Sequence, residues 1–337
     1  MSDEPLPTAG KLIERLQAEG AAHRSPDDTS EVVQLRVDGN QLASLESLLT
    51  SMGFKRLCRA GGKETGEYLG FDETTGKLVT LGLRETAGSS RGSEAGSLVA
   101  GGGVLIALVG SRGSGKTTVC DALLRWLTPA LAVRRVYFGS GDGPVSVLRW
   151  PLRAIQRALV RGDRSGGSKP AQEQSAGSKA RGARSIPGFG LVEPLWAMLV
   201  SREKSRALAG AWRARADGLV VICDRYPQNE IAGLNDGPLL TRWLERSGGL
   251  LRFMAGRERR PYEWAERHPP DVIIRLRVSE AMSRERRPRS SVAGLTSRLA
   301  AVERLTFGDS GRIVDVDADM PLDRVILAVK RRVWGAL

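Results

Sequence analysis

An apolar run that ends in a glycine-rich loop and then becomes helical constrains the fold of this chain more than any other feature. Residues 105–121 read LIALVGSRGSGKTTVCD. The first five residues are apolar, which predicts a strand that is buried on both faces. Beyond the loop, apolar residues recur at helical spacing up to Leu127. This order predicts a buried strand, a tight loop and an amphipathic helix in direct succession.

The loop itself matches the pattern G-x-x-x-x-G-K-[ST], which in this context holds nucleotide phosphates. Glycines let backbone N–H groups point at phosphate oxygens, and the helix N-terminus adds partial positive charge. Lys116 would reach the β- and γ-phosphates of ATP, and the Thr117 hydroxyl would ligate Mg²⁺. The alternative is an ordinary glycine-rich turn. The predicted nucleotide contacts are Gly110, Ser111, Arg112, Gly113, Ser114, Gly115, Lys116, Thr117 and Thr118.

Strands and helices alternate through the rest of this region. Several strands are apolar on both faces, as strands between two helix layers must be. The pattern predicts an α/β, doubly wound fold with a five-stranded parallel sheet. The expected strands are residues 104–109, 133–138, 218–223, 271–278 and 312–317.

An acid followed by an arginine ends the third of these strands, in the sequence VVICDRYP. The carboxyl ends of parallel strands meet at one edge of the sheet, beside the glycine-rich loop. Asp224 would therefore hold Mg²⁺ together with Thr117, and Arg225 would form a bidentate pair with a phosphate. The alternative is a strand-end ion pair between an acid and an arginine.

A cluster of arginines follows the fourth strand. It comprises Arg284, Arg286, Arg287 and Arg289. Mobile arginines that close over a transferring phosphoryl group neutralise its developing charge. The alternative is a solvated basic helix end.

Composition breaks divide the chain into four parts. Residues 1–30 read as a flexible tail, 31–85 as a small α+β domain with one strand, one helix and three further strands, and 86–103 as a Gly/Ser-rich linker. The α/β domain covers 104–337, and its almost entirely polar insertion at 161–186 is expected to be disordered. The small domain is short enough to need support from its neighbour.

The net charge of +13 is uneven, because residues 1–100 carry −4 and the remainder carries +17. A polyphosphate ligand, nucleic acid or an anionic lipid surface would each suit this charge, and so would solvated arginine-rich helices. Nucleic acid ranks last, because the basic residues do not alternate with aromatic ones. The three cysteines form no CxxC pair, and no secretory leader or membrane span is evident, so a cytoplasmic location is expected.

Taken together, these motifs resemble the thymidylate kinase family of nucleoside-monophosphate kinases. The DRY element at 224–226 is that family's mark, and the segment from Pro269 to Arg287 resembles its fourth strand, following helix and arginine-bearing lid. The resemblance covers about 101–337 without the insertion. It implies a P-loop fold, Mg²⁺ and ATP as cofactors, phosphoryl transfer to a nucleotide, and often a homodimer. It implies catalytic roles for Lys116, Asp224, Arg225, Arg287 and Arg289.

The acceptor half departs from the family pattern. Arg112 stands where the family's loop usually has an acid, and residues 138–144 lack the basic element that usually meets the acceptor phosphate. The acceptor therefore stays open, dTMP included. The layout is similar to a divergent branch often encoded beside surface-polysaccharide genes, in which the N-terminal unit resembles a reduced nucleotidyltransferase. Here that unit lacks the Asp-x-Asp pair, so it is predicted to be non-catalytic.

Two functions follow from this. One is Mg²⁺-ATP-dependent phosphoryl transfer to a nucleotide-like or other phosphorylated acceptor. The other is a regulatory protein that binds or weakly hydrolyses ATP and whose acceptor site has decayed. An ionised acceptor phosphate would need no general base, whereas an alcohol would want a carboxylate. The candidates for that base are Asp224, Glu193, Glu230 and Asp236.

Overall fold

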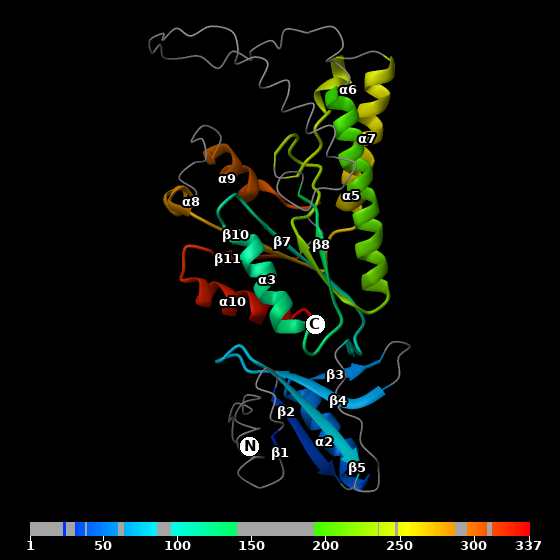
Figure 1. Ribbon diagram of the computed structural model, residues 1–337, viewed down its shortest axis with the longest axis vertical. Coiled ribbons are helices and arrows are strands. Elements are labelled where there is room, and N and C mark those ends of the chain that lie inside the picture. The colour runs from blue at the N-terminus through cyan, green and yellow to red at the C-terminus, as the bar shows by residue number, and fades with distance from the viewer. Residues whose placement is uncertain are drawn as a thin grey trace.

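The computed structural model describes ten ranges of the chain: 23–24, 31–37, 39–59, 64–85, 96–139, 192–234, 236–246, 249–286, 295–308 and 312–337. Within them the chain builds two β-sheets, one from the N-terminal part and one from the remainder (Figure 1). Several predictions concern residues outside these ranges. They are residues 1–22 and 25–30 of the tail, residues 86–95 of the linker, the insertion at 161–186, most of the loop 138–144, and Arg287 and Arg289.

The second sheet has five strands, and every pairing in it is parallel, as predicted. Its spatial order is β11-β10-β7-β9-β8. All seven residues of the central strand β7 are buried, because helices cover both faces of the sheet. The strands are β7 (Val104–Gly110), β8 (Val133–Tyr137), β9 (Val220–Asp224), β10 (Val272–Arg277) and β11 (Ile313–Asp317).

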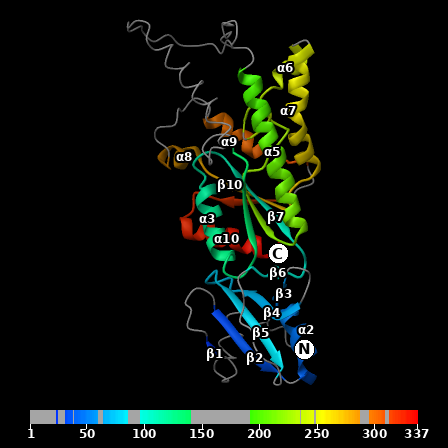
Figure 2. The ribbon, with the colours of Figure 1, turned by 45° about the vertical axis from the view of Figure 1, so that its right-hand side comes forward.

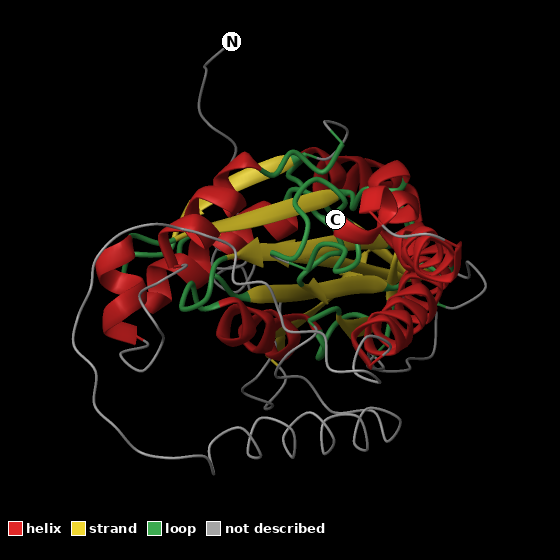
Figure 3. Ribbon diagram, turned by 90° about the horizontal axis from the view of Figure 1, so that it is seen from above, coloured by secondary structure: helices red, strands yellow, loops and turns green. Residues whose placement is uncertain are grey.

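Alternate residues of β7 enter two different cores. Ile106 and Leu108 pack with apolar side chains of α3 (Lys116–Leu127) and α10 (Leu322–Trp334). Leu105 and Ala107 pack on the other face with the long helix α5 (Val192–Ala216) and with α7 (Gly249–Arg267). Figure 3 shows the strands between these helix layers. The shorter helices are α6 (Arg242–Arg246), α8 (Glu280–Arg286) and α9 (Leu295–Arg304).

The strand order creates a crevice at the end of β7. This strand lies between β9 on one side and β10 on the other, so the connections that leave its neighbours run to opposite sides. In open α/β sheets, ligands bind outside the carboxyl ends of the strands at such a switch point. The loop 110–115 leaves β7 at this point and enters α3.

The N-terminal sheet is mixed. Strands β2 and β5 pair in parallel, and the remaining neighbours pair antiparallel in the order β1-β2-β5-β4-β3-β6. The predicted order of one strand, one helix and three strands is present from β2 to β5. The elements are β1 (His23–Arg24), β2 (Glu31–Val37), α2 (Gly39–Ser51), β3 (Lys55–Cys58), β4 (Glu64–Phe71), β5 (Leu78–Glu85) and β6 (Leu98–Val99).

One face of this sheet packs on α2 and the other on the second part of the chain. Leu49 of α2 and Leu81 of β5 share one core, whereas Leu57 and Leu69 belong to the core that contains α3 and α10. The N-terminal sheet therefore lies against the ends of α3 and α10 that are remote from the glycine-rich loop, as the two side views show (Figures 1 and 2). Residues 96–103 of the predicted linker include β6, which pairs with β3. None of the described helices could span a bilayer.

Candidate functional site

The glycine-rich loop adopts a backbone that other residues rarely take. Gly113 and Gly115 both have φ 85°, in the left-handed region that favours glycine. At Gly110, with φ 153°, a Cβ atom would lie 2.7 Å from the carbonyl oxygen of Leu276 on the neighbouring strand. Glycine is needed there because the loop passes so close to β10. The predicted strand–loop–helix succession is thus present, with α3 beginning at Lys116.

Lys116 folds back over the loop that precedes it. Its Nζ donates to the carbonyl oxygen of Ser111 at 2.5 Å and to Ser114 Oγ at 3.3 Å. Burial, together with the positive charge of Arg225 nearby, lowers the pKa of Lys116 to about 8. A buried ammonium group at this position lacks a carboxylate hydrogen-bond partner among the described residues, so an anionic ligand would stabilise its charge.

Thr117 and Asp224 meet at the carboxyl edge of the sheet. The Thr117 hydroxyl donates to Asp224 Oδ2 at 3.2 Å, although the two residues follow different strands. Arg135 of β8 donates to the same Oδ2 at 3.3 Å and to Asp121 at 2.6 Å. Asp224 is 1% exposed, and its Oδ1 atom has no hydrogen-bond partner within the described part of the chain.

The Thr117 hydroxyl and the Asp224 carboxylate are together suited to hold a magnesium ion. Mg²⁺ prefers oxygen ligands and is usually held in proteins by one or two side chains together with substrate phosphates. A buried carboxylate oxygen without a hydrogen bond is costly, because it has lost its hydration and gained nothing in return. The unpaired Oδ1 of Asp224 beside the Thr117 hydroxyl is therefore suited to a cation.

Arg225 directly follows Asp224 in the chain and has a strained backbone conformation. It has φ 74°, which a residue with a Cβ atom adopts at a cost of about 1–3 kcal/mol, and such residues gather at functional sites. Its Nη1 donates to Asp236 Oδ2 at 3.0 Å. The third residue of the DRY element has a structural role, because the buried Tyr226 hydroxyl donates to the carbonyl oxygen of His268 at 2.6 Å.

Helix α8 brings one of the predicted arginines to the loop. Arg286 donates to the carbonyl oxygens of Gly113, at 3.3 Å, and Ala318, at 2.9 Å. Ser283 of the same helix donates to the carbonyl oxygen of Arg112 at 2.8 Å. Arg284 instead pairs with Glu280 on its own helix. The part of the predicted arginine cluster that is described thus reaches the loop through Arg286.

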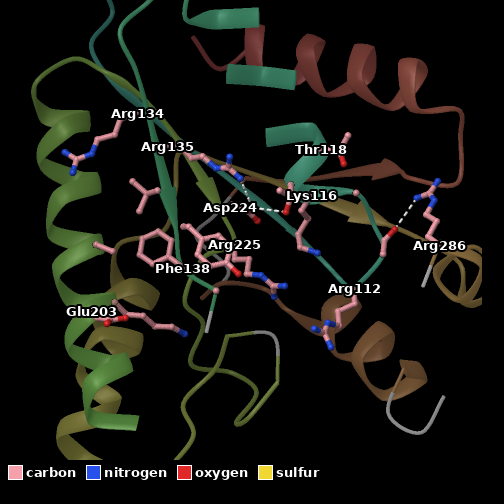
Figure 4. Close-up of a pocket in the computed structure, with 18 residues that line it drawn as sticks. Arg112, Lys116, Thr118, Arg134, Arg135, Phe138, Glu203, Asp224, Arg225 and Arg286 are labelled. Carbon is pink, nitrogen blue, oxygen red and sulfur yellow. Dashed lines mark hydrogen bonds and ion pairs between the residues drawn. The ribbon is translucent and has the colours of Figure 1, made fainter. Parts of the chain in front are cut away.

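Residues of the glycine-rich loop, α3, β8, β9, α5 and α8 line one pocket of about 870 Å³, which runs from the loop to helix α5 (Figure 4). The predicted residues Arg112, Gly113, Gly115, Lys116, Thr117, Thr118, Asp224, Arg225 and Arg286 line it, whereas Gly110 and the buried Ser111 and Ser114 are not among its lining residues. Seven further lining residues were not predicted from the sequence: Arg134, Arg135, Val136, Tyr137, Glu203, Lys204 and Ala207, whereas Phe138 and Gly139 belong to the loop 138–144 that the family resemblance assigns to the acceptor.

A signal for two of the missed residues was present in the sequence. Arg134 and Arg135 are adjacent charges inside an otherwise apolar strand. Tyr137 pairs with Asp224 in the sheet register, so both strands end at the same edge. Glu203 and Lys204 carried no such signal, because they lie in a polar stretch of α5 that resembles any solvated helix face.

The other carboxylates proposed as general bases lie in different surroundings. Glu230 accepts hydrogen bonds from the backbone N–H groups of Thr306 and Gly308, away from the residues that line the pocket. Asp236 pairs with Arg225. The side chain of Glu193 lies outside the described residues.

Two proteins of Escherichia coli (strain K12) are similar to this chain. The "Uncharacterized ATP-binding protein YghS" is 27% identical over 234 residues, which cover 69% of this chain and 93% of that protein. The "Uncharacterized ATP-binding protein YghR" is 28% identical over 239 residues, which cover 68% of this chain and 86% of that protein. No family model matches the chain.

Proposed function

We propose that this chain is a Mg²⁺-ATP-dependent kinase of the thymidylate kinase type, with a P-loop at 110–117. The observation that carries the proposal is the meeting of Thr117 and Asp224 at 3.2 Å, with the buried Oδ1 of Asp224 unpaired, beside a glycine-rich loop that begins a helix. The names of the two bacterial relatives, which describe them as ATP-binding, support the nucleotide half of this proposal.

Each residue of the loop region has a distinct task in this proposal. Backbone N–H groups of 110–117 and the first turn of α3 surround the ATP phosphates, and Lys116 neutralises the β- and γ-phosphates. Thr117 and Asp224 hold Mg²⁺, which would supply charge neutralisation on the phosphate oxygens. Lys116 gives up its bonds to Ser111 and Ser114 when it turns to the nucleotide.

The acceptor lies in the part of the pocket between Arg225 and helix α5. Phosphoryl transfer relies on positioning and charge neutralisation, so an acceptor with an ionised phosphate needs no general base. Arg225 holds the acceptor, and the segment with Arg286, Arg287 and Arg289 closes over the phosphates. The basic side chains that line the pocket favour an anionic acceptor over a neutral one.

The proposal predicts that Lys116→Met abolishes tight ATP binding. Methionine fills a similar volume without the charge, so ATP affinity falls by about 100-fold or more while the fold persists. Isothermal titration calorimetry with Mg²⁺-ATP measures the affinity, and thermal melting verifies the fold. The matched control is Lys77→Met, because Lys77 is exposed in the β4–β5 turn and should leave affinity unchanged. Equal ATP affinity in the wild type and Lys116→Met would refute the proposal.

A second candidate function is an ATP-binding regulatory protein without transfer activity. The observation in its favour is that the arginines on the acceptor side already bond to the protein itself. Arg134 donates to the carbonyl oxygen of Gly210, and Arg225 pairs with Asp236. Under this alternative, ATP binds and depends on Lys116, but no phosphorylated compound raises ADP formation above the rate with ATP alone.

A further inference from the structure

The segment that follows β9 folds back onto Arg225, a residue that lines the pocket. The guanidinium Nη1 of Arg225 donates to Asp236 Oδ2 at 3.0 Å, and the backbone N–H of Arg225 donates to the carbonyl oxygen of Leu108 at 3.0 Å. Both Arg225 and Asp236 have positive φ angles, of 74° and 68°. Figure 4 shows Arg225 in the same pocket as Lys116 and Glu203, and all three residues line it.

The buried Lys204 forms a hydrogen bond with the backbone of Asp236. Lys204 Nζ donates to the carbonyl oxygen of Asp236 at 2.8 Å and lies 4.7 Å from the centre of the Tyr262 ring. Lys204 is 3% exposed, and the Asp236 side chain is 6% exposed. An exposed ion pair contributes little, but a carboxylate this well enclosed restricts its partner to one geometry.

Hydrogen bonds and a required glycine restrict the conformation of the turn around Asp236. The Gln228 side chain bonds to the backbone of Ile231 at both its amide oxygen and its amide nitrogen, and also donates to the carbonyl oxygen of Leu234. At Gly237, a Cβ atom would lie 1.9 Å from the carbonyl oxygen of Ile231. The turn can therefore pack only with glycine at this position, directly after Asp236.

The enclosed carboxylate of Asp236 provides a counter-charge for Arg225. Arg225 and Lys116 are both positive and close enough for Arg225 to disfavour the charged form of Lys116. Without a counter-charge, the flexible arginine would turn away from Lys116 into solvent. A guanidinium has five N–H donors, so one bond to Asp236 still leaves Arg225 able to bind a phosphate in the pocket that it lines.

We propose that Asp236 is a positioning residue that holds Arg225 in place to bind the anionic group of the acceptor. This inference rests on the proposed function and adds to it that acceptor affinity, and not ATP affinity, depends on Asp236. Lys204 supports the role by fixing the backbone of Asp236. The substrate class that follows is a phosphorylated acceptor.

The decisive variant is Asp236→Asn. Asparagine tolerates positive φ at least as well as aspartate, so the backbone conformation at φ 68° persists and only the charge is lost. The matched control is Glu230→Gln, the same change in the same segment at a carboxylate that accepts from Thr306 and Gly308. A reference variant, Arg225→Met, removes the arginine itself.

The experiment measures thermal melting of each protein with Mg²⁺-ADP, with inorganic phosphate, and with both. In the wild type, ADP raises the melting temperature and phosphate raises it further. Asp236→Asn should keep the ADP increment and lose most of the phosphate increment, as Arg225→Met does, while Glu230→Gln keeps both. A full phosphate increment in Asp236→Asn overturns the inference, and so does the lack of any phosphate increment in the wild type.

The outcomes separate this inference from the proposed function. If ADP has no effect on the wild type, the proposed function fails, whatever phosphate does. If ADP stabilises every variant but phosphate does not distinguish Asp236→Asn from the wild type, only the inference fails. With an acceptor in hand, Asp236→Asn should raise the acceptor KM by roughly tenfold and leave the KM for ATP within about twofold. A merely structural role would alter both.

Discussion

At the scale of single residues, the environment of Lys116 determines how the site responds to pH. Lys116 is buried, and its pKa is lowered from its ordinary value of 10.5 to about 8. Between these two values the unfolded chain binds more protons than the folded one. Burial of the charged Lys116 amine therefore lowers the free energy of unfolding below pH 8. This penalty diminishes as pH rises through the window and returns as pH falls through it.

This gives a prediction with opposite signs for stability and affinity. As pH rises from 8 to 10, the free energy of unfolding of the ligand-free protein gains a favourable contribution from Lys116, whereas ATP affinity falls by up to about tenfold per pH unit. Urea unfolding and ATP titration in the same buffers measure the two trends. Lys116→Met should remove this contribution from both, and an ATP affinity that stays constant between pH 7 and pH 9 would contradict the assignment.

Residues at the site differ in how far the sequence could predict them. Lys116, Thr117 and Asp224 belong to local patterns that fix their place at the edge of a parallel sheet, and the structure brings all three to one pocket. The sequence indicates Asp236 only as a candidate general base. Its pairing with Arg225 depends on how the segment after β9 folds back, which no local pattern encodes.

At the scale of elements, the strands of the parallel sheet were predicted within one or two residues. β7 is an apolar run and β9 begins with one, whereas β8, β10 and β11 mix apolar residues with charged ones, and the hydrophobic pattern was still enough to locate all five. The strand order β11-β10-β7-β9-β8 and the placement of the N-terminal sheet could not be derived this way. Both depend on contacts between residues far apart in the chain, such as Phe71 with Trp126 and Trp334.

The end of β4 and the turn to β5 contact helices α3 and α10. Phe71 lies 5.4 Å from the Trp126 ring of α3 and 5.6 Å from the Trp334 ring of α10, measured between ring centroids. Lys330 donates to the carbonyl oxygen of Gly76 at 2.8 Å, and Arg331 to that of Glu73 at 2.7 Å. Helix α10 therefore supports the N-terminal sheet through both apolar and polar contacts.

We predict that Phe71→Ala destabilises the protein by about 3–5 kcal/mol, since it leaves a cavity between two tryptophan rings. Urea unfolding followed by tryptophan fluorescence measures this loss, because Trp126 and Trp334 report on the contact directly. The control is Leu48→Ala on α2, where the side chain is 44% exposed and the loss should stay near 0.5 kcal/mol. A loss below about 1 kcal/mol for Phe71→Ala would contradict a stabilising role for the contact of Phe71 with α3 and α10.

At the scale of the whole molecule, positive charge is concentrated where the pocket lies. The pocket lining includes seven basic side chains and two acidic ones, in the part of the chain that carries the excess of +17. A cleft lined by one sign of charge attracts ligands of the other sign and raises their local concentration. The homodimer that the family resemblance implies stays a prediction.

The measurement that tests the central claim most directly is ADP formation from Mg²⁺-ATP, alone and with a panel of acceptors. The panel contains dTMP, other nucleoside monophosphates, nucleosides and sugar phosphates. We predict that one phosphorylated acceptor raises the rate well above that with ATP alone, and that Lys116→Met abolishes the increase. If the wild type binds ATP but no member of the panel raises the rate, transfer is contradicted and the ATP-binding regulatory function is favoured instead.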